Sequence, residues 1–102
     1  MGKNRIIKIL GNIFGNVVVH KILAKHTNKP ESIHHLEEEI GAYRDNAFEI
    51  SLQFNWNEQD KLEIKKETLE NFSKRIKKYP DVRFEMKEVG KLIGEIISET
   101  ID

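Results

Sequence analysis

Histidine and glutamate side chains near residue 30 carry the clearest metal-ligand chemistry in this sequence. The chain has four histidines and no cysteine, so a zinc or iron site would have to use imidazole and carboxylate ligands. His34 and Glu38 are one helical turn apart, and Glu31 precedes His34 with the Glu-x-x-His spacing that di-iron bundles use. His20 can approach them across a short intervening loop. The candidate metal ligands are therefore His20, His34 and Glu38.

Two features argue against a metal at this place. A second Glu-x-x-His pair on another helix, which a di-iron bundle requires, is missing from the sequence. His34 and His35 directly follow Ile33, and this places both histidines off the apolar side of their helix. A histidine such as His20, on an apolar helix face, more often has its hydrogen bonds satisfied inside the fold. We therefore predict no cofactor and expect the acidic residues to favour a helix N-terminus.

A basic cluster near residue 76 offers a different chemistry, contact with phosphate. Its members are Lys74, Arg75, Lys77 and Lys78. The formal net charge of the chain is zero, so no overall field attracts nucleic acid or an anionic membrane. A neutral protein can still bind nucleic acid through one patch. Nucleic-acid binding is thus an alternative function, and a solvated helix end is the simpler explanation.

Motifs of enzyme active sites are missing from the sequence. There is no cysteine, no Gly-rich phosphate loop, no G-x-S-x-G elbow and no H-E-x-x-H. The serines have no recognisable histidine and aspartate partners along the chain. We therefore name no catalytic residue and favour a non-catalytic function.

Hydrophobic periodicity predicts an all-α fold, a compact bundle of four helices in one domain over residues 1–102. The expected helices span about 4–25, 30–54, 58–79 and 85–101. In the second segment, apolar residues from Ile33 to Phe54 recur at gaps of three and four. We expect this long helix to be the central one. Leu62, Leu69 and Met86 are assigned to the core faces of the last two helices.

An α+β fold is the alternative, with strands near 47–56 and 82–86. Apolar and polar residues alternate from Phe48 to Trp56, which is a strand pattern. We favour the helix because the apolar stripe continues without a break to Phe54. A sheet of only two strands would also be marginally stable.

Two glycine pairs with a spacing of four predict a close helix contact. Gly11 and Gly15 lie in the first helix, and Gly90 and Gly94 lie in the last. Small residues four apart leave a shallow groove in which another helix can approach. We expect the first and last helices to cross there. The alternative is that the glycines merely bend their helices.

Apolar surface in excess of what four short helices can cover indicates a partner. The first helix is apolar over most of its circumference, and the second has two apolar faces near its end. Uncovered apolar patches usually mark interaction surfaces. We therefore predict an oligomerisation or protein-interaction module with a surface at Phe48, Leu52 and Trp56. The partner is another protein or a second copy, and a homodimer is the specific prediction.

Charge and hydropathy patterns bear on arrangement and location. Residues 1–30 carry six bases and no acid, and residues 31–60 carry eight acids and one base. Such alternating blocks suit sequential antiparallel helices. The apolar run at 9–19 contains two asparagines and is too short to span a membrane. With no cysteine either, we expect a cytoplasmic protein that does not enter a membrane.

Overall fold

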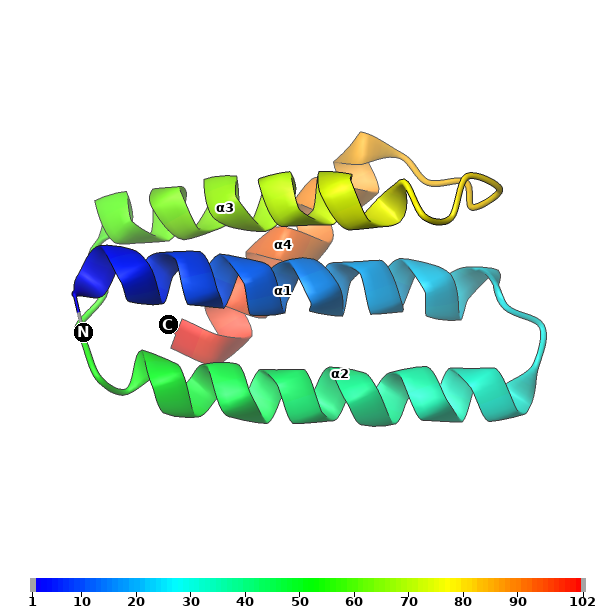
Figure 1. The fold of residues 1–102 in the computed structure, drawn as a ribbon, viewed down its shortest axis with the longest axis horizontal. Helices are drawn as coiled ribbons and strands as arrows, with labels where there is room; N and C mark the ends of the chain where they lie inside the picture. Colours follow the sequence, from blue (N-terminus) through cyan, green and yellow to red (C-terminus); the bar gives the residue numbers. More distant parts are fainter. Residues whose placement is uncertain (1, 102) are drawn as a thin grey trace.

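Four α-helices make up the computed structural model, which describes residues 2–101 (Figure 1). They are α1 (Lys3–His26), α2 (Pro30–Ser51), α3 (Glu58–Ile76) and α4 (Met86–Ile101). Within the described residues no segment forms a strand. The predicted all-α bundle is therefore confirmed, and the alternative with strands near 47–56 and 82–86 is wrong.

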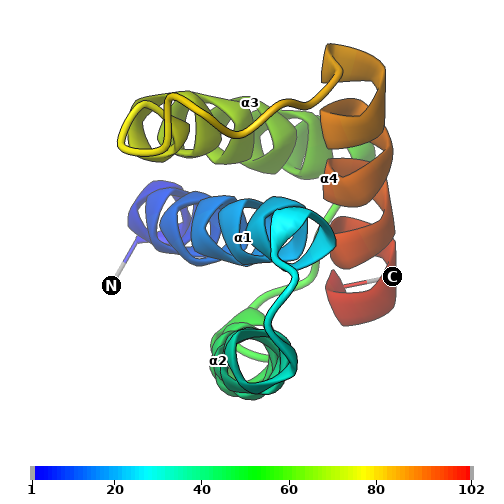
Figure 2. The same cartoon turned by 90° about the vertical axis from the view of Figure 1, so that its right-hand side faces the viewer.

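The central helix is α1, so the expectation that α2 would be central is wrong. Figure 2 shows α1 between α2 and α3, with α4 running across them. Eleven residues of α1 are buried, against three in α2. An apolar stripe on one side, as in α2, needs a neighbour on that side alone. A helix that is apolar around most of its girth, as α1 is, needs neighbours on several sides.

The composition of α1 would also allow it to cross a membrane. The whole helix has 24 residues, and the mean hydropathy of its apolar window is 1.5. The apolar run at 9–19, taken alone, is too short to span a membrane, but the complete helix is long enough. In this structure 61% of that window is buried by the other helices. Packing inside the bundle thus covers most, but not all, of this apolar window.

The directions of the helices differ from a simple antiparallel series. The first turns of α1 and α3 lie together, with Lys3 Nζ at 2.5 Å from Asp60 Oδ2, and the two helices run in the same direction (Figure 1). α2 runs antiparallel to α1 and is separated from α3 by α1 (Figure 2). The acidic second block therefore lies beside the basic first block, as expected, but not beside the basic third one.

α2 ends at Ser51, three residues before the predicted end. The backbone N–H groups of residues 52–54 donate to carbonyls three positions back rather than four, which tightens the chain into a final turn. Trp56 Nε1 then donates to the carbonyl of Ser51 at 2.9 Å. The rings of Phe54 and Trp56 meet edge to face at 5.8 Å. The chain thus folds back over the end of α2 and keeps Phe54 packed on the core.

The first glycine pair packs closely against a helix, but the helix is α3. A Cβ on Gly15 would stand 2.7 Å from Asn71 Cβ, and one on Gly11 would overlap Glu67 Cβ. At Gly90 and Gly94 nothing lies within 4 Å of such an atom. The predicted crossing of α1 and α4 at their glycines is therefore wrong.

The reason is the way in which α4 meets the bundle. It buries its branched apolar side chains instead, and its glycines lie beside that face. The buried residues of α4 are Val89, Leu92, Ile93, Ile96, Ile97 and Thr100.

Reciprocal capping fixes the start of α3. Asn57 Oδ1 accepts a hydrogen bond from the Asp60 N–H at 2.8 Å, and Asp60 Oδ2 accepts one from the Asn57 N–H at 3.1 Å. Lys3 Nζ of α1 donates to the same carboxylate. These contacts, with Lys3 first, hold the pKa of Asp60 below its ordinary value of 3.8.

Asp60 is expected to contribute to the acid sensitivity of the fold. Because its pKa is lower in the folded chain, its stabilisation is present above the ordinary pKa and is lost as the pH falls through the folded-state pKa. Asp60→Asn should lower the free energy of unfolding at neutral pH and flatten its decline below about pH 4. Urea unfolding at several pH values measures both effects. The exposed Asp45→Asn is the control, and equal curves for Asp60→Asn and the native chain would contradict this.

Candidate functional surfaces

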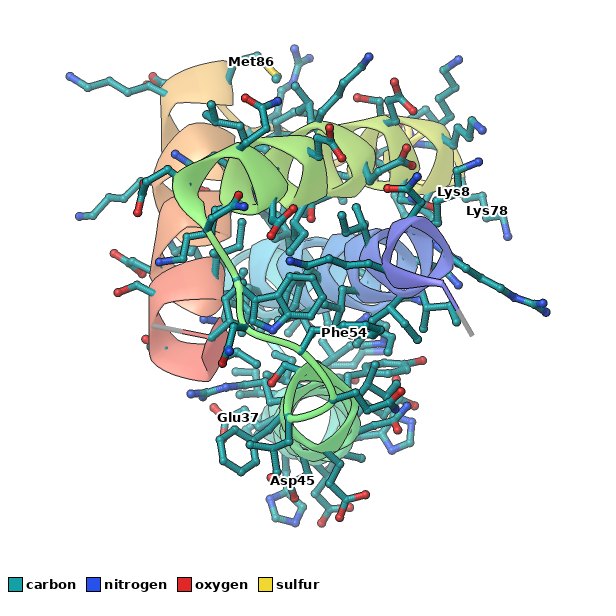
Figure 3. All side chains as sticks on the ribbon, turned by 90° about the vertical axis from the view of Figure 1, so that its left-hand side faces the viewer. Lys8, Glu37, Asp45, Phe54, Lys78 and Met86 are labelled. Atoms are coloured by element: carbon teal, nitrogen blue, oxygen red, sulfur yellow. The ribbon has the colours of Figure 1, made fainter. Side chains whose placement is uncertain are left out.

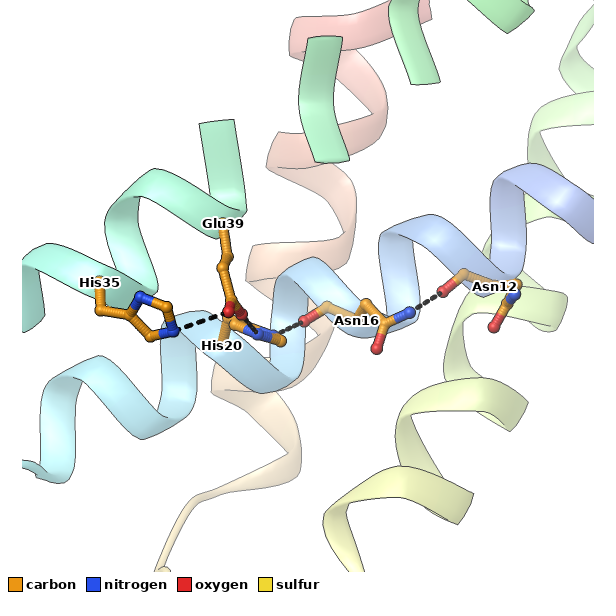
Figure 4. Close-up of polar contacts among 5 residues, drawn as sticks. All are labelled: Asn12, Asn16, His20, His35 and Glu39. Atoms are coloured by element: carbon orange, nitrogen blue, oxygen red, sulfur yellow. Dashed lines mark hydrogen bonds and ion pairs between the residues drawn. The ribbon is translucent and has the colours of Figure 1, made fainter. Parts of the chain in front are cut away.

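The predicted metal ligands lie at and beside the contact between α1 and α2, in pairs other than those expected. His20 Nε2 contacts Glu39 Oε2, and His35 Nε2 lies 2.9 Å from Glu39 Oε1 (Figure 4). His34 pairs with Glu38 at 2.7 Å on the outer face, where the His34 side chain is 76% exposed. Within residues 2–101 no group of three histidines or acids is arranged to hold a metal ion. The structure does not bring the predicted three ligands together.

The physical reason is a shift of one residue along α2. Successive residues of an α-helix are rotated by about 100° around its axis. Glu39 therefore faces α1, whereas Glu38 points to solvent with its partner His34. The sequence showed a run of three glutamates and did not show which of them turns inward.

His20 has both ring nitrogens paired inside the fold. Its Nδ1 lies 2.7 Å from the carbonyl oxygen of Asn16, which can only accept, so Nδ1 carries a hydrogen. Its Nε2 faces Oε2 of the Glu39 carboxylate, so the second ring nitrogen also has a hydrogen-bonding partner. The Tyr43 ring meets the imidazole edge-on at 5.5 Å. The expectation of a histidine satisfied inside the fold is confirmed, and the pair joins α1 to α2.

One residue of the basic cluster contacts another helix, and the other three are exposed to solvent. Lys74, Lys77 and Lys78 are exposed at and beyond the end of α3. Arg75 is half-buried and donates through its guanidinium to Asn12 Oδ1 of α1. Arg75 is thus a contact between helices, and the three lysines remain the predicted residues for a nucleic-acid contact.

The predicted interaction surface forms a patch at the end of α2, which we call the α2 end patch. Phe48 and Leu52 are 51% and 69% exposed. They border an open hollow of about 460 Å³ between the ends of α2 and α4, to which Ile101 also contributes. Trp56 differs from the expectation, because it is half-buried and lines the hollow with its indole bonded to Ser51.

Charged side chains edge the α2 end patch. Asp45 and Glu49 are exposed on α2, within four residues of Phe48. Arg44 pairs with Glu99 of α4 at 2.6 Å, and a second hollow between them opens beside Phe48. An apolar centre with a polar rim is the composition of protein interfaces. The rim is acidic, with three carboxylates and one guanidinium.

A second apolar surface, the α3–α4 groove, was missed at the level of sequence. Leu62 is 58% exposed and Met86 57% exposed, and Leu69 is also exposed. Two open hollows of about 180 and 220 Å³ lie along it, lined in part by Gly94 and Gly90 respectively. The sequence of each helix is amphipathic, and Leu62, Leu69 and Met86 lie on the apolar faces. They were therefore predicted to lie in the core. Their exposure follows from the oblique crossing of α3 and α4, which leaves the helices in contact over a short length (Figure 2).

Comparison with protein-family models, curated proteins and solved structures found no match to this chain.

Proposed function

We propose that this protein is an interaction module that associates with further copies of itself through the α2 end patch. The observation that carries the proposal is the pair Phe48 and Leu52, one helical turn apart and both more than half exposed beside an open hollow. Full burial of one such side chain is worth about 1.5–3 kcal/mol. Covering both, together with the edge of Ile101, would supply the apolar centre of an interface.

The polar residues around the patch support a specific contact rather than nonspecific apolar association. Asp45 and the Arg44–Glu99 pair stand beside Phe48. Charges at the rim of an interface add little affinity but select orientation and partner. The α2 end patch therefore combines an apolar anchor with groups that can discriminate between surfaces.

Sedimentation velocity over micromolar to millimolar concentrations tests the proposal. We expect the native chain to form oligomers as its concentration rises. Leu52→Glu should raise the dissociation constant by at least about tenfold, because the loss of one buried leucine exceeds 1.4 kcal/mol. Ala42→Glu adds the same charge at an exposed position of α2 away from the patch and should leave association unchanged. A native chain that stays monomeric throughout would overturn the proposal.

A further inference from the structure

We infer that this association is head to tail, with the α2 end patch of one copy bound in the α3–α4 groove of the next. The inference rests on the proposed self-association and specifies the surface that receives the patch. It is carried by the open space in the groove and by the charges of the two surfaces.

The α3–α4 groove has room for side chains of the patch. Phe48 projects from the last turn of α2, and Leu52 projects from the residue that caps its C-terminal end. The groove is open, since nothing stands within 4 Å of an added Cβ at Gly90 or Gly94. Its two hollows lie on either side of Lys65, which lines both. Two side chains from successive helical turns can therefore enter two hollows, as knobs enter grooves between packed helices.

The charges disfavour pairing of like surfaces. Asp45, Glu49 and Glu99 edge the α2 end patch, so joining patch to patch would bring carboxylates together. Lys65 stands at the middle of the groove, so joining groove to groove would bring cations together. Patch on groove places the acidic rim opposite the lysines of the groove, and like charges across an interface cost several kcal/mol. Arg44 offsets one carboxylate of the rim, since it is paired with Glu99.

Lysines outnumber acids among the further charged side chains along the groove. Lys87 and Lys91 are exposed on α4, one position after Met86 and Gly90, which places them along the outer edge. Glu58 at one end of the groove is paired with Lys61 at 3.6 Å. Glu95 is exposed one position after Gly94 and is an acid on the same edge. The four lysines along the groove still outnumber its two acids, so its net charge is positive and suits an acidic patch. The lysines are Lys61, Lys65, Lys87 and Lys91, and the acids are Glu58 and Glu95.

The two surfaces follow one another along α4. The hollow of the patch includes Thr100 and Ile101, and the groove begins at Ile97 and Ser98 and reaches Met86 at the start of the helix. Figure 3 shows Asp45 on the outer side of α2 and Met86 at the start of α4, at the far end of that view. A copy whose patch is occupied therefore still exposes the part of its groove near Gly90 and Met86. A heterologous contact of this kind builds a ring or an open filament, so we expect assemblies larger than a dimer at high concentration.

A mixing experiment separates head-to-tail association from patch-to-patch association. Leu52→Glu disables the patch and leaves the groove, whereas Leu62→Glu disables the groove and leaves the patch. Both leucines are more than half exposed, and circular dichroism and thermal unfolding check that both variants fold like the native chain. We expect each variant alone to sediment as a monomer and an equimolar mixture to form dimers that grow no further. Ala42→Glu keeps both surfaces intact, so its mixture with Leu52→Glu is the reference for a mixture in which one partner has a working patch and a working groove.

Each other outcome overturns the inference in a recognisable way. If Leu62→Glu alone still associates like the native chain while Leu52→Glu does not, the patch pairs with itself and the proposed function stands. If both variants are monomeric and their mixture also stays monomeric, the two surfaces do not meet. A native chain that is monomeric removes both proposals. Raised salt should weaken the native assembly, because screening reduces the attraction between patch and groove.

Discussion

Phe14→Ala is expected to lower the free energy of unfolding by about 3–5 kcal/mol, the cost of deleting a fully enclosed aromatic ring. Phe14 is 0% exposed and lies in the middle of α1. It belongs to the core cluster to which all four helices contribute, and α1 itself is flanked by α2 and α3 (Figure 2). A small domain has only about 5–15 kcal/mol to lose, so this one change removes a large part of its stability. Urea unfolding followed by circular dichroism measures the loss.

Phe48→Ala is the matched control, because it makes the same change on α2. Phe48 is half exposed, so its loss should cost the monomer less than about 1 kcal/mol. Should Phe14→Ala fail to fold, Ile22→Val on α1 and Ile33→Val on α2 repeat the comparison with smaller changes. Ile22 is fully buried and Ile33 only partly, and a buried Ile→Val costs about 0.5–1.5 kcal/mol. Equal losses on the two helices would contradict the central position of α1.

The contrast between α1 and α2 shows what periodicity can and cannot predict. The regular stripe from Ile33 onward correctly predicted a helix with one buried face. It did not indicate how many neighbours the helix has, and α2 proved to be peripheral. The signal for the central helix was the broad apolar surface of α1, which only α2, α3 and α4 together can cover.

Helix ends and partners were harder to predict than helices. Phe54 continues the stripe of α2 because the final tight turn keeps its side chain on the core, so the pattern did not mark Ser51 as the end. Gly11 and Gly15 predicted a close approach correctly. They did not identify α3 as the partner, because the partner depends on the path of the connecting segment 52–57 between α2 and α3.

Of the two candidate surfaces, one could be predicted from the sequence and the other could not. The exposure of Phe48 and Leu52 could be predicted, since they lie outside the main stripe of α2. The groove could not, because it exists only where two separately amphipathic helices cross. Leu62 and Met86 each lie on an apolar face of their own helix, and only the crossing leaves them uncovered.

Gly11→Ala and Gly15→Ala are expected to destabilise the protein by about 1–3 kcal/mol each, the usual cost of forcing a methyl group into a packed contact. An added Cβ at Gly15 would meet Asn71 Cβ at 2.7 Å and the Phe72 backbone nitrogen at 3.1 Å. These atoms belong to the backbone of α3 or are attached directly to it, so no side-chain rotation relieves the contact. α1 and α3 would have to move apart. Thermal or urea unfolding measures the loss.

Gly90→Ala and Gly94→Ala make the same change where there is open space. Here alanine should stabilise the folded chain by about 0.5–1 kcal/mol, because glycine loses more conformational freedom in a helix. The two pairs of substitutions are expected to change stability in opposite directions because only the first pair lies where α1 packs on α3. A neutral or stabilising Gly11→Ala would show that this contact is looser than described. The double variant at Gly11 and Gly15 should cost less than the two single changes added together. Once one methyl group has separated the helices, the second meets a partly opened contact.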